Sequence, residues 1–341
     1  TLIFTRSGED GRTRFAAINA LLAAGQTVAF DDIVDAEFHT VGGGSLEVLG
    51  NVVAMGRTYA EGADGTLGQQ VPPVRDTTAL GEAPIAIAPL PEERTRYNIG
   101  ITEIAGAGGV VMIGERVVEL QPFSHVQFAG DSRFAEVSVI SGEARVAAYV
   151  SQVNEGGDAM FIPAERLRNA IVQRAVPAIS AEPWHSDFWF STAGGTRVIR
   201  DPLEGTGVRR PYVERVTTLP NELAGSRIRN GGTDQFVPFA EAASPDEQQL
   251  LFIESQPPYR TNIGIFSNLD QETIAEVVVY DAAGEEVQRA TLKTTDGVAQ
   301  MPVTASVTGG RAVVRFLGGN GHAYASLVDN RTGDATYVEG R

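Results

Sequence analysis

The chain has 341 residues, of which 43% are hydrophobic, and it contains 38 glycines, 17 prolines and no cysteine. This length suits two to four domains, and the lack of cysteine excludes disulfides, thiol catalysis and cysteine-bound metal sites. The formal charge of −16 disfavours nucleic acid as a partner because acidic surfaces repel phosphate groups, and no apolar run has the roughly 18–20 residues that would predict membrane insertion.

The first segment predicts short strands and one short helix. The residues TLIF at 1–4 already form a strand-like pattern, so no secretory leader is visible and we expect the chain to begin downstream of its true start. A helix is predicted at 31–37, and GSLEVL at 44–49 alternates apolar and polar residues as a half-buried strand does. The segments RTY (57–59) and GTLGQQVP (65–72) predict a closing β-hairpin.

The second segment has a different opening but a similar end. It opens with RYNIGI (96–101), and FAEVSVI (134–140) alternates in the manner of a strand. It closes with AYVSQVN (148–154), a glycine turn and GDAMFIP (157–163). The turn residues are those that positive φ angles require, so this end also predicts a hairpin.

The chain then repeats both patterns. After a proline-bearing stretch at 163–183, for which a short helix is predicted, RIR (227–229) and GTDQFVP (232–238) match the end of the first segment. A second linker is predicted at 239–247. The last segment matches the second, and its counterparts are YRTNIGI (259–265), AYASLVDN (323–330) and GDATYV (333–338).

This internal similarity predicts four modules in an a-b-a-b order. Several short strands per module, separated by turns, are typical of antiparallel sandwiches. We therefore predict an all-β chain of tandem immunoglobulin-like β-sandwiches, each with its own two-layer core, arranged as a stiff, extended array. The predicted modules are a1 at 1–76, b1 at 77–164, a2 with its linker at 165–241, and b2 at 242–341.

The repeat resembles tandem immunoglobulin-like modules in secreted and surface proteins of soil and thermal-spring bacteria. The matching segments are WHSDF (184–188), residues 57–70, RTNIG (260–264) and residues 323–334. The resemblance covers nearly the whole chain. It implies a sandwich fold and export to the extracellular space or cell surface, and it implies no particular activity.

Module a1 departs from this pattern because it has no counterpart of residues 184–190. A missing first strand would leave an open sheet edge. Either the residues lie outside the given chain, or a neighbouring subunit donates the strand and builds a filament. Both explanations stay open at this stage.

Asp329, Asn330 and Asp334 are weak candidates for binding calcium, because their oxygen atoms are close in sequence. The distal Glu and the regular Asp spacing of a calcium loop are missing, so an Asx-rich turn is the alternative interpretation. No other cofactor is predicted.

Trp189 is a weak candidate for binding a sugar or a protein partner. Strand alternation places Trp184, Phe188 and Phe190 on one face and Trp189 on the other. Core or interdomain packing is the alternative. The arginines at strand starts are expected to bind backbone or carboxylate groups across strands or domains, and they are Arg57, Arg96, Arg227 and Arg260.

No catalytic residues are predicted. The four histidines are far apart, and the Gly-x-Ser-x-Gly elbow is absent. The leading hypothesis is a non-enzymatic structural or adhesion module of a bacterial surface or filamentous assembly, with other proteins or copies of itself as partners and polysaccharide as a further candidate. The alternatives are a carbohydrate- or protein-binding accessory region of a secreted enzyme, and a hydrolase with its site at a module junction.

Overall fold

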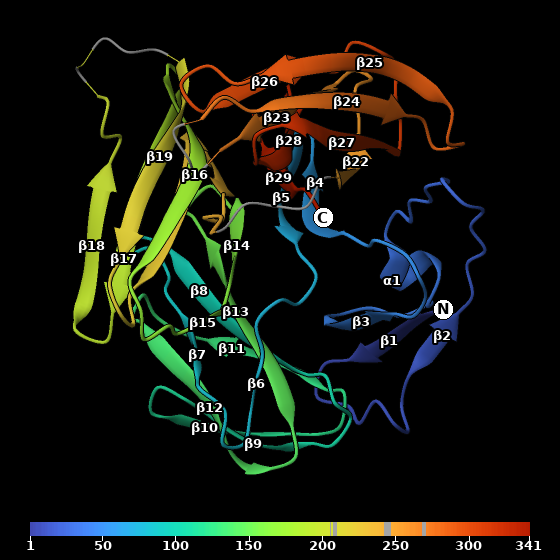
Figure 1. Cartoon of the computed structure of the whole chain (residues 1–341). Helices are drawn as coiled ribbons and strands as arrows, with labels where there is room; N and C mark the ends of the chain where they lie inside the picture. The colour runs from blue at the N-terminus through green and yellow to red at the C-terminus, as the bar shows by residue number, and fades with distance from the viewer. Residues whose placement is uncertain (205, 207–209, 242–246, 268–270) are drawn as a thin grey trace.

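The computed structural model describes residues 1–204, 206, 210–241, 247–267 and 271–341 (Figure 1). Within these residues nearly all regular secondary structure is antiparallel strand, so the all-β prediction is confirmed. No described helix is long and apolar enough to cross a membrane. Most of the predicted linker at 239–247 lies outside the described residues.

The a1 region forms a three-stranded sheet and a separate hairpin. The sheet has the order β2-β1-β3, and one face packs on helix α1 through Leu2, Phe4 and Phe38. The helix lies within the predicted range 31–37. The elements are β1 (Leu2–Arg6), β2 (Ala16–Ile18), α1 (Ile33–Ala36), β3 (Gly44–Val48), β4 (Gly56–Gly62) and β5 (Gly65–Val71).

The b1 region is a sandwich of two sheets. One sheet has the order β10-β9-β12-β7-β15 and the other β11-β8-β13-β14, with β6 beside β13. The strands are β6 (Thr78–Ala79), β7 (Ile85–Ile87), β8 (Arg96–Glu103), β9 (Gly109–Ile113), β10 (Arg116–Leu120), β11 (His125–Ala129), β12 (Ala135–Gly142), β13 (Arg145–Val153), β14 (Ala159–Pro163) and β15 (Glu165–Arg166).

The a2 region is a single sheet of order β19-β16-β17-β20-β21, with β18 paired to β17. The helix predicted within 163–183 is wrong, because this stretch forms β15, which pairs with β7 of b1, and the whole of β16. The strands are β16 (Val172–Ala181), β17 (Trp184–Thr192), β18 (Gly195–Arg200), β19 (Arg210–Thr218), β20 (Leu223–Asn230) and β21 (Thr233–Phe236).

The b2 region is again a sandwich, with sheets of order β22-β27-β24-β25 and β26-β23-β28-β29. The strands are β22 (Glu247–Ile253), β23 (Tyr259–Phe266), β24 (Ile274–Tyr280), β25 (Glu286–Lys293), β26 (Val298–Pro302), β27 (Gly310–Gly318), β28 (His322–Asp329) and β29 (Ala335–Glu339).

The cores are shared rather than independent. Modules b1 and b2 each bury a two-layer core, but the a2 sheet uses both faces against its neighbours. Trp189 enters the b1 core, while Phe188 and Phe190 pack with Phe266 and Tyr324 of b2. The structure therefore differs from the expected row of four separate two-layer cores, because alternate side chains of one sheet serve two different modules.

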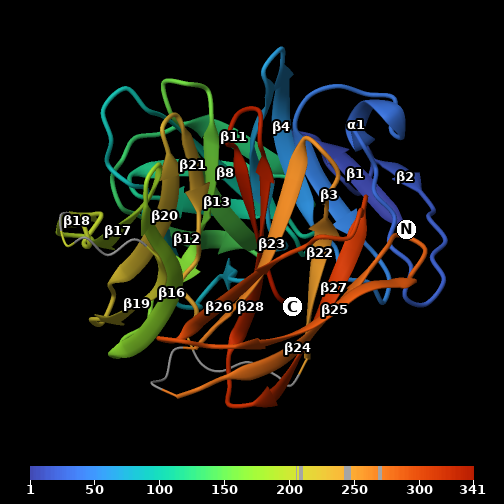
Figure 2. The same ribbon diagram turned by 90° about the horizontal axis from the view of Figure 1, so that it is seen from above.

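The four modules form a closed ring around one centre. In Figure 1, a1 (blue) lies on the right, b1 (green) below, a2 (yellow-green) on the left and b2 (orange-red) above. The last strand of each closing hairpin is an edge strand, and these strands contact one another in the cycle β5, β14, β21, β29 and back to β5. The array is thus ring-shaped, and the view from above in Figure 2 also shows that the modules do not form an extended row.

Candidate functional site

The four closing strands line a central pocket with equivalent positions of the repeat. A pocket of about 60 Å³ lies between them, and each strand contributes the same four positions. The first set is Gly68, Ala159, Asp234 and Ala335; the second is Gln69, Met160, Gln235 and Thr336; the third is Gln70, Phe161, Phe236 and Tyr337; the fourth is Pro72, Pro163, Pro238 and Glu339.

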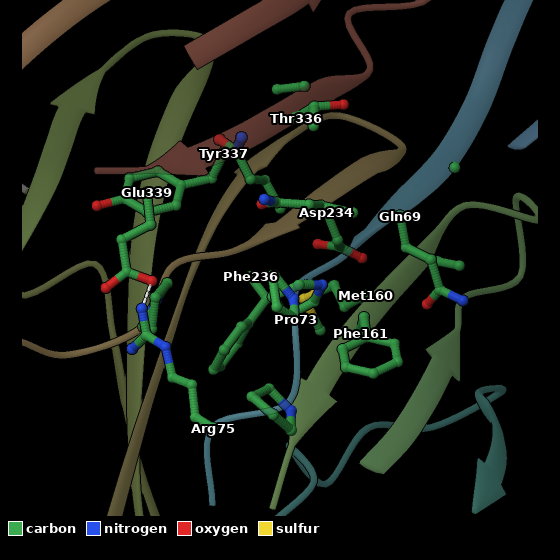
Figure 3. A pocket seen from close by; sticks show the side chains of 18 residues that line it. Gln69, Pro73, Arg75, Met160, Phe161, Asp234, Phe236, Thr336, Tyr337 and Glu339 are labelled. Atoms are coloured by element: carbon green, nitrogen blue, oxygen red, sulfur yellow. Dashed lines mark ion pairs between the residues drawn. The ribbon is translucent and has the colours of Figure 1, made fainter. Parts of the chain in front are cut away.

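The pocket is chiefly apolar, with one ion pair beside it. The aromatic rings of Phe161, Phe236 and Tyr337 line it together with several prolines (Figure 3). Arg75 and Glu339 form a salt bridge among the lining residues. Burial, with the nearby charge of Arg341, lowers the pKa of Arg75 to about 10, so it stays protonated at neutral pH. Such a wall suits a small apolar group rather than an anion.

Aromatic rings next to the pocket pack directly against strand glycines. A Cβ atom on Gly100 would lie 2.2 Å from the ring of Tyr149, and one on Gly264 would lie 2.3 Å from the ring of Tyr324. Tyr149 in turn stacks on Phe161 at 4.3 Å, and Tyr324 on Tyr337 at 5.5 Å between ring centroids. The repeated Asn-Ile-Gly-Ile pattern therefore makes room for the rings that support the pocket wall.

Two aspartates at the same repeat position lie beside the turns of the closing hairpins. Asp158 of b1 accepts the backbone N–H of Asp234 from a2 at 2.6 Å, and Asp334 of b2 pairs with Arg57 of a1. Burial, with the neighbouring charge of Asp334, raises the pKa of Asp158 to about 8. Burial raises the pKa of Asp334 to about 6, although Arg57 opposes the shift. Each carboxyl keeps one buried oxygen, Oδ1, that has no hydrogen-bond partner among the described residues.

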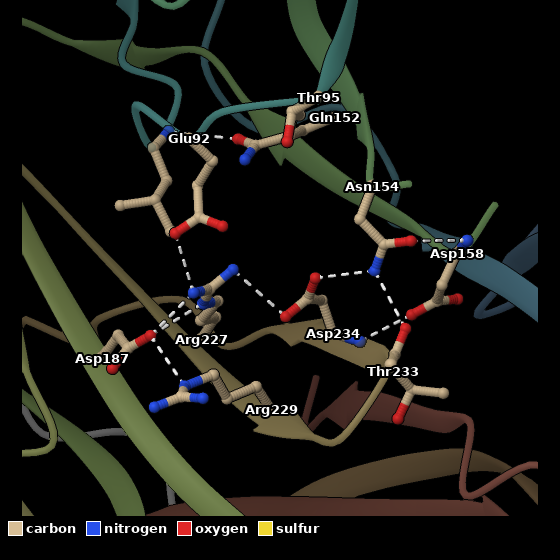
Figure 4. Close-up of polar contacts among 12 residues, drawn as sticks. Glu92, Thr95, Gln152, Asn154, Asp158, Asp187, Arg227, Arg229, Thr233 and Asp234 are labelled. Carbon is tan, nitrogen blue, oxygen red and sulfur yellow. Dashed lines mark hydrogen bonds and ion pairs between the residues drawn. The ribbon is translucent and has the colours of Figure 1, made fainter. Parts of the chain in front are cut away.

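A buried ion network joins a2 to b1 (Figure 4). Arg227 donates to Asp187 of its own module at 2.9 and 2.8 Å and to Glu92 of b1 at 2.9 Å. Asn154 of b1 donates to Asp234 and to the carbonyl oxygen of Gly232 in a2. The prediction that strand-start arginines bind carboxylates across strands or domains is confirmed for Arg57 and Arg227.

Trp189 does not form a binding surface, and that prediction is wrong. The side chain is fully buried, and its indole Nε1 donates to the carbonyl oxygen of Ala88 at 2.8 Å. It sits in the b1 core, with Phe236 at 6.1 Å between ring centroids. The alternative of interdomain packing is correct, because module b1 covers the face of β17 that carries Trp189.

The calcium candidates bind groups of the chain itself. Asp329 accepts from Arg331 at 2.6 Å and from the backbone N–H of Thr66 at 3.2 Å. Asn330 Nδ2 donates to the carbonyl oxygen of Pro258, and Asp334 pairs with Arg57. Within the described residues, no group of three or more His, Cys, Asp or Glu side chains is arranged to hold a metal ion.

A serine and a histidine meet at the a1–b1 junction. Ser7 Oγ lies 2.8 Å from His125 Nδ1, and His125 Nε2 lies 2.9 Å from the Tyr149 hydroxyl. Burial lowers the pKa of His125, which keeps the imidazole neutral. The second nitrogen faces a phenol, whereas a Ser-His-Asp triad places a carboxylate there.

Comparisons with known proteins do not identify a family. The chain matches no family model and no curated protein. Among solved structures, dimeric latent PorU from Porphyromonas gingivalis is similar at 10% sequence identity, with a TM-score of 0.21. The match covers 81% of this chain and 35% of PorU, and a TM-score this low carries no argument about fold or function.

The pocket, and the equivalence of Asp158 and Asp334 near it, were not predicted from the sequence. The signal was present, because the four hairpin ends align residue by residue and three of them carry an aromatic residue at the same position. Alignment alone gives no reason for these ends to meet, since edge strands also exist in extended arrays.

Proposed function

We propose that this protein is a non-enzymatic structural or adhesion unit of an assembly outside the bacterial cell. The observation that carries the proposal is the convergence of all four closing hairpins on one centre, with buried side chains at the junctions. Modules held together in this way are expected to move as one rigid body. A rigid body suits a structural role, in which the protein bears mechanical load or keeps other components apart.

The junctions supply the rigidity. Trp189 and Leu223 of a2 are buried against b1, and Phe188 is buried against b2. Polar contacts add to this packing, since Arg227 reaches Glu92 and Arg57 reaches Asp334. Interfaces that bury aromatic and arginine side chains hold their partners firmly, so the modules are expected to move together.

The proposed setting is the extracellular space or cell surface, with copies of the chain or other proteins as partners. The resemblance to surface repeat modules supports this setting, and the charge of −16 favours a surface that stays hydrated. Immunogold labelling of intact producing cells with antibodies against the purified chain tests the location. Gold on the outer surface or on filaments is expected, and gold confined to the cytoplasm would contradict the proposal.

A hydrolase at a module junction is a second candidate, favoured by the short contact between Ser7 and His125. A fluorophosphonate probe reports an activated serine nucleophile. Under the structural proposal the purified chain does not react with it. Labelling that disappears in Ser7→Ala and persists in the matched Ser45→Ala variant would favour the hydrolase instead.

A binding role at the central pocket is a third candidate, favoured by its aromatic and proline wall. Calorimetric titration with a panel of oligosaccharides and proline-rich peptides tests it. Saturable binding that Phe161→Ala weakens would support a binding module. Heats equal to dilution for the whole panel would count against it.

A further inference from the structure

The central pocket is bounded by four strand edges as well as by side chains. Among the described residues, β5, β14, β21 and β29 each end a sheet, and all four line the pocket. The backbone groups on such an edge have no neighbouring strand, and buried backbone N–H and C=O groups need hydrogen-bond partners. The hollow between the edges is therefore polar as well as apolar.

The register shows which backbone groups face the pocket. Val237 N–H donates to the carbonyl oxygen of Ser226 within the a2 hairpin, whereas Asp234 N–H points outward and donates to Asp158 of b1. Because hydrogen-bonding directions alternate along a strand, the backbone of Phe236 also points outward. The residues at its repeat position in the other modules are Gln70, Phe161 and Tyr337. This third set of lining residues thus offers backbone donors and acceptors to the pocket.

Gln235 adds a side-chain amide to the same wall. It lines the pocket and is only 5% exposed. Its Nε2 has no hydrogen-bond partner among the described residues, and a buried donor left unmatched is costly. Gln69, at the same repeat position in a1, uses its amide oxygen to accept from Ser151 at 3.0 Å. The wall therefore favours a ligand that brings a hydrogen-bond acceptor to Gln235.

The charged lining residues already have partners of opposite charge. Glu339 pairs with Arg75, and Asp234 pairs with Arg227 at 3.1 Å. No other Asp, Glu, Lys or Arg lines the pocket, so no unpaired charge in the wall attracts an ion of either sign. An apolar wall with a few polar groups suits a neutral ligand.

The size of the pocket limits the buried group to a few atoms. An atom about as large as a water molecule needs about 10–15 Å³ of such a volume, so the pocket of about 60 Å³ holds roughly four non-hydrogen atoms. An acetamido group has this size and is neutral. Its methyl carbon suits the aromatic and proline wall, and its C=O and N–H suit the strand edges and Gln235.

The pocket opens beside an ion pair. Pro73 and Arg75 are exposed lining residues, and Arg75 pairs with Glu339 at this end (Figure 3). A guanidinium group supplies donors and a carboxylate supplies acceptors, and a sugar hydroxyl can use both because it donates and accepts. An alkyl chain would gain nothing from these two groups.

We propose that the central pocket binds the acetamido group of an N-acetylated amino sugar, with the sugar ring lying against Arg75 and Glu339. The Nε2 of Gln235 donates to the acetamido oxygen. All four modules line the site, so closure of the ring creates it. The inference deepens the proposed adhesion role, on which it rests, because it names the ligand that an adhesion unit of this kind would hold.

The test uses the full chain and a simple glycoside. The probe is methyl N-acetyl-β-glucosaminide, and saturation-transfer NMR follows its titration. Saturable binding is expected, with the strongest signal on the acetyl methyl protons because that group is buried. Methyl β-glucoside has a hydroxyl in place of the acetamido group and is expected to bind at least about 10-fold more weakly. No saturation up to about 10 mM, or equal affinity of the two sugars, would overturn the proposal.

A third probe separates sugars from acetylated proteins. The amide of ε-N-acetyl-lysine carries the same acetamido group on an alkyl chain. Weaker binding than that of the amino sugar is expected, because the chain cannot use the ion pair at the opening. Binding as tight as that of the sugar, or tighter, would contradict the assignment to a carbohydrate.

A matched pair of variants tests the place of binding. Gln235→Met keeps the length of the side chain but removes the donor, and Gln127→Met makes the same change at an exposed position of β11. With folding confirmed by circular dichroism, the first variant is expected to lose at least about 10-fold in affinity for the amino sugar and the second none. Equal affinities would contradict the assignment to the pocket. The assay needs no cells, so its failure is separable from a failure of the surface location.

Discussion

Glycines in the repeated Asn-Ile-Gly-Ile pattern are needed for space rather than for backbone freedom. Gly100 and Gly264 lie inside strands, each beneath a tyrosine ring that covers the missing side chain. Gly225 does the same beneath Trp189. A strand glycine normally weakens a sheet, and here the loss is offset by an aromatic ring packed against the backbone at that position.

Substitution of one such glycine measures this packing. Gly264→Ala would bring a Cβ atom to 2.3 Å from the Tyr324 ring, and overpacking of this kind costs about 1–3 kcal/mol. The matched control is Gly318→Ala, because a Cβ there meets no atom within 4 Å. Chemical denaturation should show the loss in the first variant only; equal free energies of unfolding would contradict this account.

The carboxyl of Asp158 makes stability depend on pH. Burial and Asp334 raise its pKa to about 8, above the value of about 3.9 in an unfolded chain. The folded protein thus binds the proton more tightly, so this contribution is complete below about pH 4 and is lost as the pH rises toward 8. Asp334, with a pKa of about 6, contributes in the same direction over the lower part of that range.

Removing the titrating group should flatten the pH profile. Asp158→Asn keeps an oxygen for the Asp234 N–H but carries no charge, so we expect its Tm at pH 8 to exceed the wild-type value by at least about 2 °C. Near pH 4 the difference should be small. The control is Asp131→Asn, whose carboxylate is exposed and paired with Arg133. Thermal unfolding measured from pH 4 to 8 checks this prediction. Parallel Tm profiles for Asp158→Asn and wild type would show that the Asp158 carboxyl does not cause the pH dependence.

At the scale of elements, the ring protects strand edges. β5, β14, β21 and β29 each end a sheet, and exposed edges invite pairing with other chains. They meet through side chains and a few turn contacts, such as Thr233 Oγ1 donating to the carbonyl oxygen of Gly333. Each module thus covers its neighbour's edge, and the β4 edge stands out because no described strand covers it.

The a2–b1 junction depends on the ion network around Asp187. Asp187→Ala would leave Arg227 buried without its main partner, and breaking a buried pair costs about 3–5 kcal/mol. The control is Glu286→Gln, which breaks an exposed pair with Arg289 and should cost less than about 1 kcal/mol. Denaturant unfolding measures the free energy of unfolding of both variants. Similar decreases in the two would show that the ion network does not stabilise the junction.

Local patterns predicted the elements well, and contacts between modules poorly. The hairpins, the short helix and the arginine–carboxylate pairs follow from turn residues and strand alternation, which act over a few positions. Core or interdomain packing of Trp189 was foreseen as an alternative, but alternation assigns only a face, so the module that covers it could not be predicted. Ser7 and His125 are brought together by a1–b1 docking, which leaves no spacing signal in either segment.

At the scale of the whole molecule, the a-b-a-b repeat is expressed as an approximate two-fold relation. Asp158 of b1 accepts a backbone N–H from a2, and Asp334 of b2 likewise accepts one from Gly68 of a1. Residues at the same repeat position therefore close two equivalent junctions.

The size of the chain in solution tests ring closure most directly. Small-angle X-ray scattering of the monomer should give a radius of gyration of about 20 Å, the value for a compact chain of this length. Four separate modules in a row would give roughly 35 Å or more. A value near 20 Å agrees with four hairpins meeting at one centre, and a value near the larger figure would contradict it.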